Sequence, residues 1–324
     1  ANLAAGVSGA DAPRLLAVRG GDPLSAILCA HVDRHGLISL GEGQYAYAAQ
    51  RIREQRYDDV NKASQKELRN IADRFQGEHV YAYDPVTGAR LGEGTIETCT
   101  PCEIAGDAQF SIQGLYDMPP QTPMAYGRTA RVENNYLKGQ LDNALSVGMI
   151  YTLFKKGFQG TALFSTEEEI GKSWIHLAAY LESEKIETKN LLVLDTSPYV
   201  DAAPIKEGLI VFRHRDTSEI FNPALTEALT ERCRRIGLRF HYKDDYLITL
   251  GKTVDQLGST ELGKLIKHSQ GRWSGATVQI PTLMYHTSRE TTSLDALRHF
   301  ERFLANILIE DPLLPALQSG SSKD

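Results

Sequence analysis

The stretch Thr161-Ala-Leu-Phe-Ser-Thr-Glu-Glu-Glu-Ile-Gly171 joins a short, largely apolar run to three consecutive acids. An apolar run of this length is consistent with a buried strand of a parallel sheet. Three adjacent carboxylates repel one another, and on a surface helix they would form an ordinary solvated face. Directly after a strand, and followed by Gly171, they stand where ligand sites form in open α/β sheets. We therefore expect these acids to face a cation.

Similar apolar runs alternate with helical patterns along the chain, which predicts an α/β fold with a mainly parallel sheet flanked by helices. The expected strands are Leu15–Val18, Ala26–Ala30, Thr161–Ser165, Leu191–Leu194, Leu209–Phe212 and Thr282–Tyr285. The expected helices are Asn143–Lys156, Trp174–Ser183, Pro223–Ile236, Ser259–His268 and Ser293–Ile309.

Residues 45–130 show a different pattern. A charged, helix-like stretch, Ala46–Phe75, precedes short alternating runs at Val80–Tyr83, Gly94–Thr98 and Ala108–Ile112. Such runs indicate strands of a smaller β-rich domain. We expect this domain, residues 45–130, to be inserted into a larger α/β domain made of residues 1–44 and 131–324.

The composition of the chain argues against several classes of protein. The 324 residues carry a net charge of −6, which argues against a nucleic-acid partner. No apolar stretch is long enough to span a membrane, and no signal peptide is visible. Four cysteines are too few for a disulfide framework, so we expect a reducing, cytoplasmic location. The pair Cys99 and Cys102 lacks the second pair of a zinc ribbon, and we interpret it as two ordinary thiols.

Four more segments supply metal-ligand residue types. His31 and Asp33 alternate on an extended segment, so both side chains point to one face, and the carboxylate can accept a hydrogen bond from a cation-bound imidazole. Asp142 stands where a helix begins, as a helix cap or as a carboxylate that bridges two metals. Asp195 and His286 each close an apolar strand, and each is as readily structural as catalytic.

Taken together and in order, these segments resemble the tetrahedral or glutamyl aminopeptidase family of di-metal exopeptidases, over residues 15–309. The matching segments are Ala30–Asp33 with Gly36, Leu141–Asn143, Glu168–Gly171, Leu194–Thr196 and Tyr285–Ser288 with Glu290, and Ser259-Thr260-Glu261 looks like the family's Gly-Thr-Asp. This chain departs from the family pattern in several places. Asn143 stands where the family usually has Asp, and Ala144 where it usually has Arg. Arg34 and His35 replace a common Glu and an apolar residue, and the family's N-terminal helix is missing.

The resemblance implies a role for each position. Asp142 bridges two metals. His31 and Asp195 complete one metal site, and Glu169 and His286 complete the other. Glu168 is the general base, and Asp33 orients His31. Three ligand carboxylates and two divalent ions leave one positive charge, which matches a metal-bridging hydroxide.

The resemblance further implies a zinc-exopeptidase-like fold and a metal-dependent aminopeptidase that acts on peptides. It also implies a homo-oligomer in which the inserted domain forms contacts or controls substrate access. Nitrogen and oxygen ligands favour zinc, with cobalt and manganese as alternatives. The many acids beside the metals suit a free α-ammonium group on the substrate. Glu167 is either a partner of that amine or, in the interpretation we favour, a solvated surface acid.

Other functions remain open at this point. An amidase or deacylase of small N-acylated substrates would use the same di-metal site. Glycoside hydrolysis needs two carboxyl groups facing each other about 5–10 Å apart, and it would leave both histidines unexplained. A non-catalytic scaffold derived from a peptidase should have lost ligands or the base, and here all of them are kept.

Overall fold

The computed structural model describes residues 14–58, 64–102 and 107–314, which form two compact units. The larger unit contains Arg14–Asp33, Arg131–Tyr285 and residues 290–314. The smaller unit contains Arg34–Ala130 and the short segment His286–Arg289. The first strand of the smaller unit, β3 (Leu37–Gly41), lies before residue 45.

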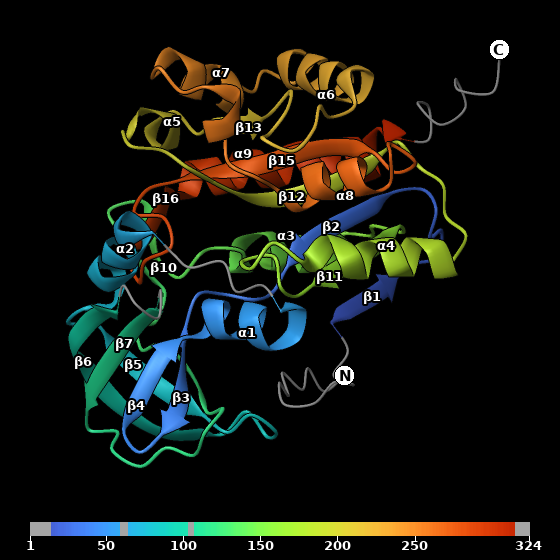
Figure 1. Ribbon diagram of the computed structural model, residues 1–324. Coiled ribbons are helices and arrows are strands. Elements are labelled where there is room, and N and C mark those ends of the chain that lie inside the picture. Colours follow the sequence, from blue (N-terminus) through green and yellow to red (C-terminus); the bar gives the residue numbers. More distant parts are fainter. Residues whose placement is uncertain (1–13, 59–63, 103–106, 315–324) are drawn as a thin grey trace. The chain divides into compact units, whose positions relative to one another are not determined.

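A seven-stranded sheet forms the centre of the larger unit (Figure 1). Its strands, in spatial order, are β1 (Leu15–Arg19), β11 (Thr161–Ser165), β2 (Ile27–His31), β12 (Leu191–Pro198), β15 (Gly275–Thr282), β13 (Ile210–Phe212) and β14 (Phe240–Tyr242). The four strands from β11 to β15 are parallel, while β1 and β13 each run antiparallel to their inner neighbours. The α/β prediction with a mainly parallel sheet is therefore confirmed.

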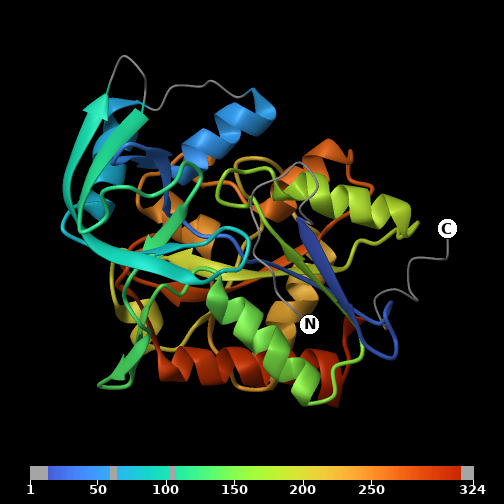
Figure 2. The same cartoon turned by 90° about the horizontal axis from the view of Figure 1, so that it is seen from below.

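Helices cover both faces of this sheet because its central strands are apolar on both sides. Leu28 and Ala30 of β2 pack into one core with α3 (Ala144–Lys155), α6 (Pro223–Arg235) and α9 (Leu294–Ala305). Ile27 and Cys29 pack into the other core with α4 (Ser173–Ser183) and α8 (Glu261–His268). Figure 2 shows α3 and α9 side by side. The helices of this unit are α3 (Ala144–Lys155), α4 (Ser173–Ser183), α5 (Ala203–Lys206), α6 (Pro223–Arg235), α7 (Lys243–Thr249), α8 (Glu261–His268), α9 (Leu294–Ala305) and two short helical turns, Val254–Gln256 and Asn306–Glu310.

The larger unit also contains a three-stranded sheet, and the segment that carries Asp142 follows one of its strands. Its order is β16 (Glu290–Ser293), β10 (Tyr136–Gly139) and β9 (Arg131–Glu133). The antiparallel pairing of β10 with β16 sets Gly139 opposite Glu290. This register brings the start of β16 close to the segment that carries Asp142.

The smaller unit is a closed six-stranded barrel with two helices. The barrel order is β3 (Leu37–Gly41), β4 (Gln44–Tyr47), β7 (Asp107–Gln113), β6 (Arg90–Cys102), β5 (His79–Tyr83) and β8 (Pro123–Tyr126). The charged stretch Ala46–Phe75 forms α1 (Ala48–Tyr57) and α2 (Gln65–Phe75). Ser64 and Glu67 cap α2 reciprocally, and its apolar face, including Phe75, packs into the barrel core.

One predicted strand is misplaced. The strand expected at Thr282–Tyr285 is in fact β15, which ends at Thr282. All eight residues of β15 are buried, although Thr277 and Gln279 interrupt its apolar pattern. Gln279 is stabilised there because it accepts a hydrogen bond from Arg213 and donates one to the carbonyl of Thr196. Within the described part of the chain, no helix is long and apolar enough to cross a membrane.

Candidate active site

His31, Asp142 and Asp195 converge at the C-terminal end of the parallel strands. His31 ends β2, Asp195 lies in the neighbouring β12, and Asp142 directly precedes the residue that caps α3. Nε2 of His31 lies 3.2 Å from Oδ1 of Asp142 and 3.5 Å from Oδ1 of Asp195. Each residue offers one ligand atom within 4.8 Å of the others. The larger unit therefore brings together the three side chains that the sequence assigned to one metal.

Asp33 connects this histidine to the acid triplet. Nδ1 of His31 lies 3.2 Å from the backbone carbonyl of Asp33 and 3.6 Å from its carboxylate. A carbonyl can only accept, so Nδ1 donates its proton to it, and Nε2 faces the two aspartates. The Asp33 carboxylate accepts the backbone N–H groups of Glu168 and Glu169, each at 3.1 Å. One residue thus positions both a proposed ligand and the proposed base.

The backbone around Asp142 is held by a buried carboxylate that the sequence analysis gave no role. Oε2 of Glu290 accepts the N–H groups of Leu141 at 2.6 Å and of Asp142 at 2.9 Å. The side chain of Asn143 donates to the carbonyl of Leu194, at 2.8 Å. The residue at the N-cap of α3 is Asn143, so the capping interpretation of Asp142 is wrong. No local pattern reveals these contacts of Glu290, because its partners lie far away in the sequence.

Carboxylates crowd this part of the larger unit. Burial raises the pKa of Glu168 to about 8, helped by the charges of Asp195 and Asp33 and opposed by that of His31. Burial and the nearby Asp142 raise the pKa of Asp195, and they raise that of Glu169 well above its usual value. A positive charge would stabilise the ionised carboxylates. Imidazole nitrogen and carboxylate oxygen are ligands that divalent transition metals accept, so the residues present fit a metal ion.

Glu167 does not belong to this carboxylate group. It is only 6% exposed, and its carboxylate lies 2.9 Å from Nε2 of His176 and 3.6 Å from Nε of Arg14. The expectation of a solvated surface acid is therefore wrong. Arg14 lies far from Glu167 in the sequence, and His176 reaches it from the following helix, α4, so no pattern within the acid triplet predicted this burial. Since the carboxylate is engaged with these two side chains, Glu167 is also a poor partner for a substrate amine.

Glu261 is a second buried acid whose contacts the sequence did not reveal. It begins α8, and its carboxylate accepts a hydrogen bond from the hydroxyl of Ser165 at 2.5 Å. Burial raises its pKa, although hydrogen bonds from Ser165 and Ser173 oppose the shift. Ser165 is the last residue of β11, so Glu261 binds the end of the strand that directly precedes the acid triplet.

His286 lies in the smaller unit, where its segment is fixed by buried Glu78. The Glu78 carboxylate accepts hydrogen bonds from the Ser288 hydroxyl at 2.7 Å, from Arg289 at 3.1 Å and from Arg128 at 2.9 Å. The other sequence-predicted residues, His31, Asp33, Asp142, Glu168, Glu169 and Asp195, all belong to the larger unit. Of the cysteine pair, Cys99 is a free thiol, and the side chain of Cys102 falls outside the described part.

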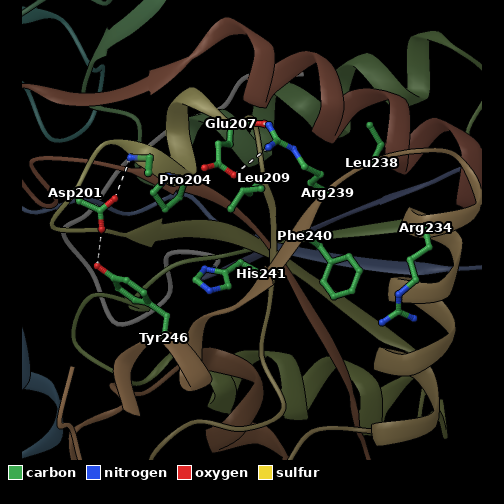
Figure 3. Close-up of a pocket in the computed structure, with 11 residues that line it drawn as sticks. Asp201, Pro204, Glu207, Leu209, Arg234, Leu238, Arg239, Phe240, His241 and Tyr246 are labelled. Atoms are coloured by element: carbon green, nitrogen blue, oxygen red, sulfur yellow. Dashed lines mark hydrogen bonds and ion pairs between the residues drawn. The ribbon is translucent and has the colours of Figure 1, made fainter. Parts of the chain in front are cut away.

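A cavity elsewhere in the larger unit, of about 620 Å³, contains none of these residues. Figure 3 shows its lining, with Asp201 bonded to Tyr246 at 2.9 Å and Glu207 paired with Arg239 at 3.1 Å. Its charged side chains largely neutralise one another. The crowded acids beside His31, whose pKa values are raised by burial, therefore remain the better candidate for chemistry.

Comparisons with known proteins show to which family the chain belongs. The family model described as M42 glutamyl aminopeptidase matches residues 120–303, which is more than half of the chain. No curated protein matches.

Solved structures resemble the whole fold. They include the TET1 peptidase of Pyrococcus horikoshii (TM-score 0.62, 17% identity, 91% of this chain and 86% of that one). A TET aminopeptidase from the marine sediment archaeon Thaumarchaeota archaeon SCGC AB-539-E09 has a TM-score of 0.65 at 15% identity (94% and 86%). An aminopeptidase from the archaeon Desulfurococcus kamchatkensis has a TM-score of 0.66 at 12% identity (96% and 86%). At such identities these structures support the fold, and the family match goes further: the chain belongs to the M42 glutamyl aminopeptidase family and is a metallo-aminopeptidase, a peptide hydrolase.

Proposed function

We propose that this protein removes residues one at a time from the N-terminus of peptides, using two divalent metal ions. The convergence of His31 on Asp142 and Asp195 carries the proposal, because it forms a buried set of nitrogen and oxygen donors. His31 and Asp195 would hold one ion, Glu169 and His286 the other, and Asp142 would give one oxygen to each. Zinc is the ion we favour, since the set contains imidazole and carboxylate without thiolate.

The ions, when bound, would polarise the scissile carbonyl and lower the pKa of a water molecule, so that this water can be deprotonated to a nucleophile. The protein's own residues perform the proton transfers. Glu168 takes a proton from the attacking water and passes it to the leaving amine. Asp33 holds the backbone of Glu168 through a 3.1 Å hydrogen bond, so the base is fixed relative to His31. We call the site with His31 and Asp195 the first metal site and the site with Glu169 and His286 the second. The larger unit therefore contains both the proposed base and the first metal site.

The acids of the site favour a substrate with a free amine. A protonated α-amino group can pair with a carboxylate through a charge-assisted hydrogen bond. A C-terminal carboxylate would need a cation there, and Arg289 is bound to Glu78. We therefore infer an N-terminal exopeptidase in preference to a carboxypeptidase or a deacylase.

The test compares a short peptide, its N-acetylated form, and a set of N-acyl amino acids. We expect acetylation to remove most of kcat/KM, and we expect products to appear one residue at a time from the N-terminus. Internal cleavage of the blocked peptide at a comparable rate would overturn the exopeptidase assignment. Preferential hydrolysis of the N-acyl amino acids would instead establish the deacylase alternative.

We further propose that the larger unit is the catalytic domain and that the barrel of the smaller unit mediates self-association. The P. horikoshii TET1 peptidase is described as assembling into a tetrahedron or a large octahedral shell. In the barrel unit of this chain, Val86 and Tyr116 are 70% and 68% exposed, which leaves apolar surface available for contacts between copies.

Light scattering at micromolar concentration should give a mass at least twice the 35.9 kDa of one chain. Exchanging both Val86 and Tyr116 for Lys should shift the population toward smaller species, because charge is disfavoured in a buried interface. Val200→Lys is the control, since Val200 is even more exposed, at 82%, but belongs to the larger unit. A wild-type protein that is monomeric under these conditions would contradict the proposal.

A further inference from the structure

Two imidazoles of the smaller unit lie against each other. The rings of His35 and His286 are 4.0 Å apart between centroids and meet edge to face, at an interplanar angle of 68°. One ring nitrogen of each lies within 4.8 Å of the other, a separation that one metal ion can bridge. His35 is 8% exposed, and it occupies a position where the resembled family commonly has an apolar residue.

Tyr47 fixes which nitrogen of His35 is available. Its hydroxyl forms a hydrogen bond with Nδ1 of His35, which leaves Nε2 as the atom that can bind a metal. Tyr47 ends β4 and packs edge to face on Phe75, at 6.0 Å, so the barrel core holds the hydroxyl in place. A histidine whose second nitrogen is bound by a buried partner is the usual arrangement of a metal ligand.

We propose that His35 is an additional metal ligand, which binds through Nε2 to the same ion as His286. This inference rests on the proposed function, because that proposal makes His286 a ligand. A further neutral imidazole leaves the charge of the site unchanged and raises its share of nitrogen donors. Such a site favours zinc or cobalt over magnesium or calcium, which prefer oxygen.

A structural role is the competing explanation. The His35 ring also stacks on that of Tyr47, with centroids 5.7 Å apart at 25°, so it could simply fill the space beside the barrel. That role predicts a loss of stability without any loss of metal. Metal binding must therefore be measured separately from folding.

The decisive variant is His35→Asn. The Asn amide occupies roughly the place of Nδ1, so it can keep the bond to Tyr47, and it lacks an atom at the place of Nε2. Zinc and cobalt titrations should find two sites in the wild type. In the variant, the first site should be unchanged and the second at least ~10-fold weaker. Tyr47→Phe should also weaken the second site, by up to ~10-fold, because it removes the orienting hydroxyl.

His79→Asn is the matched control. His79 also belongs to the barrel and contacts the ring of Tyr81 edge to face, at 5.1 Å, but it is not among the proposed ligands. Its replacement should leave both metal affinities unchanged. Circular dichroism melting of all three variants reports folding independently of metal binding.

X-ray absorption of the zinc-loaded wild type gives a result that does not depend on any variant. It should show three imidazoles shared between two ions, where the ligand set without His35 would show two. If folded His35→Asn bound metal at both sites with the wild-type affinities, the role of His35 alone would be overturned. Finding only two imidazoles in the zinc-loaded wild type would have the same consequence. A wild type that binds no metal, or only one ion, would overturn the di-metal proposal itself.

Discussion

Glu168→Gln should lower kcat by about 10²–10⁴-fold and leave the metal content unchanged. Glutamine has nearly the shape of glutamate but cannot accept the proton of the attacking water. The backbone N–H of residue 168, which binds the Asp33 carboxylate, is retained in the variant, so its local structure should persist. Steady-state kinetics on a free-amine peptide, together with metal analysis after dialysis, measure the two quantities.

Glu167→Gln is the matched control, because it makes the same change one residue earlier. Glu167 pairs with His176 and Arg14, so this variant should lose stability and keep kcat near the wild-type value. The reverse result, with Glu168→Gln active and Glu167→Gln inactive, would transfer the role of base to Glu167. Loss of metal from Glu168→Gln would instead make Glu168 a ligand.

Asp142→Ala should lose both the bound metal and the activity. Its carboxylate lies 3.2 Å from Nε2 of His31 and is the group that we propose both ions share. Removing it weakens both sites at once, so activity should fall by more than the ~10²–10⁴-fold expected for losing the base. Metal analysis by mass spectrometry, with peptide hydrolysis on the same samples, tests this.

A suitable comparison is Asp201→Ala, which removes an acid that binds Tyr246 at the cavity of Figure 3. That variant should keep both metals. Full metal occupancy in Asp142→Ala would show that Asp142 is a structural acid, and the di-metal proposal would then fail. Adding excess zinc should recover little activity in Asp142→Ala, because the shared carboxylate itself is missing.

The sequence predicted those elements whose signal is local. Thr161–Ser165 was recovered with the bounds of β11, because an apolar run ends there at a change to acids. The centre of β15 was missed, because the buried Gln279 looks like a loop residue until its bonds to Arg213 and Thr196 are known. Secondary structure was thus predictable where hydrophobicity alone decides burial.

The candidate site, too, was predictable only where its signal is local in the sequence. The residue types at positions 31 and 195 were visible at strand ends and that at position 142 at the start of a helix, and the structure brings these three together. The contacts that support these three residues were not visible. Glu290 and Glu261 act through partners far along the chain, and the burial of Glu167 depends on His176 and Arg14. Residue types follow from sequence, whereas the pairing of buried charges requires the three-dimensional fold.

The bond from Glu290 to the N–H of Asp142 spans 148 positions of the chain, and it has a consequence for synthesis. A ribosome makes Asp142 long before it makes Glu290. Until then the buried N–H groups of Leu141 and Asp142 lack their acceptor, and the loop that carries Asp142 lacks this support. Contacts between such distant positions also form late in folding. We therefore expect nascent chains that stop short of Glu290 to lack peptidase activity, because the loop that carries Asp142 gains this support only once Glu290 has been made.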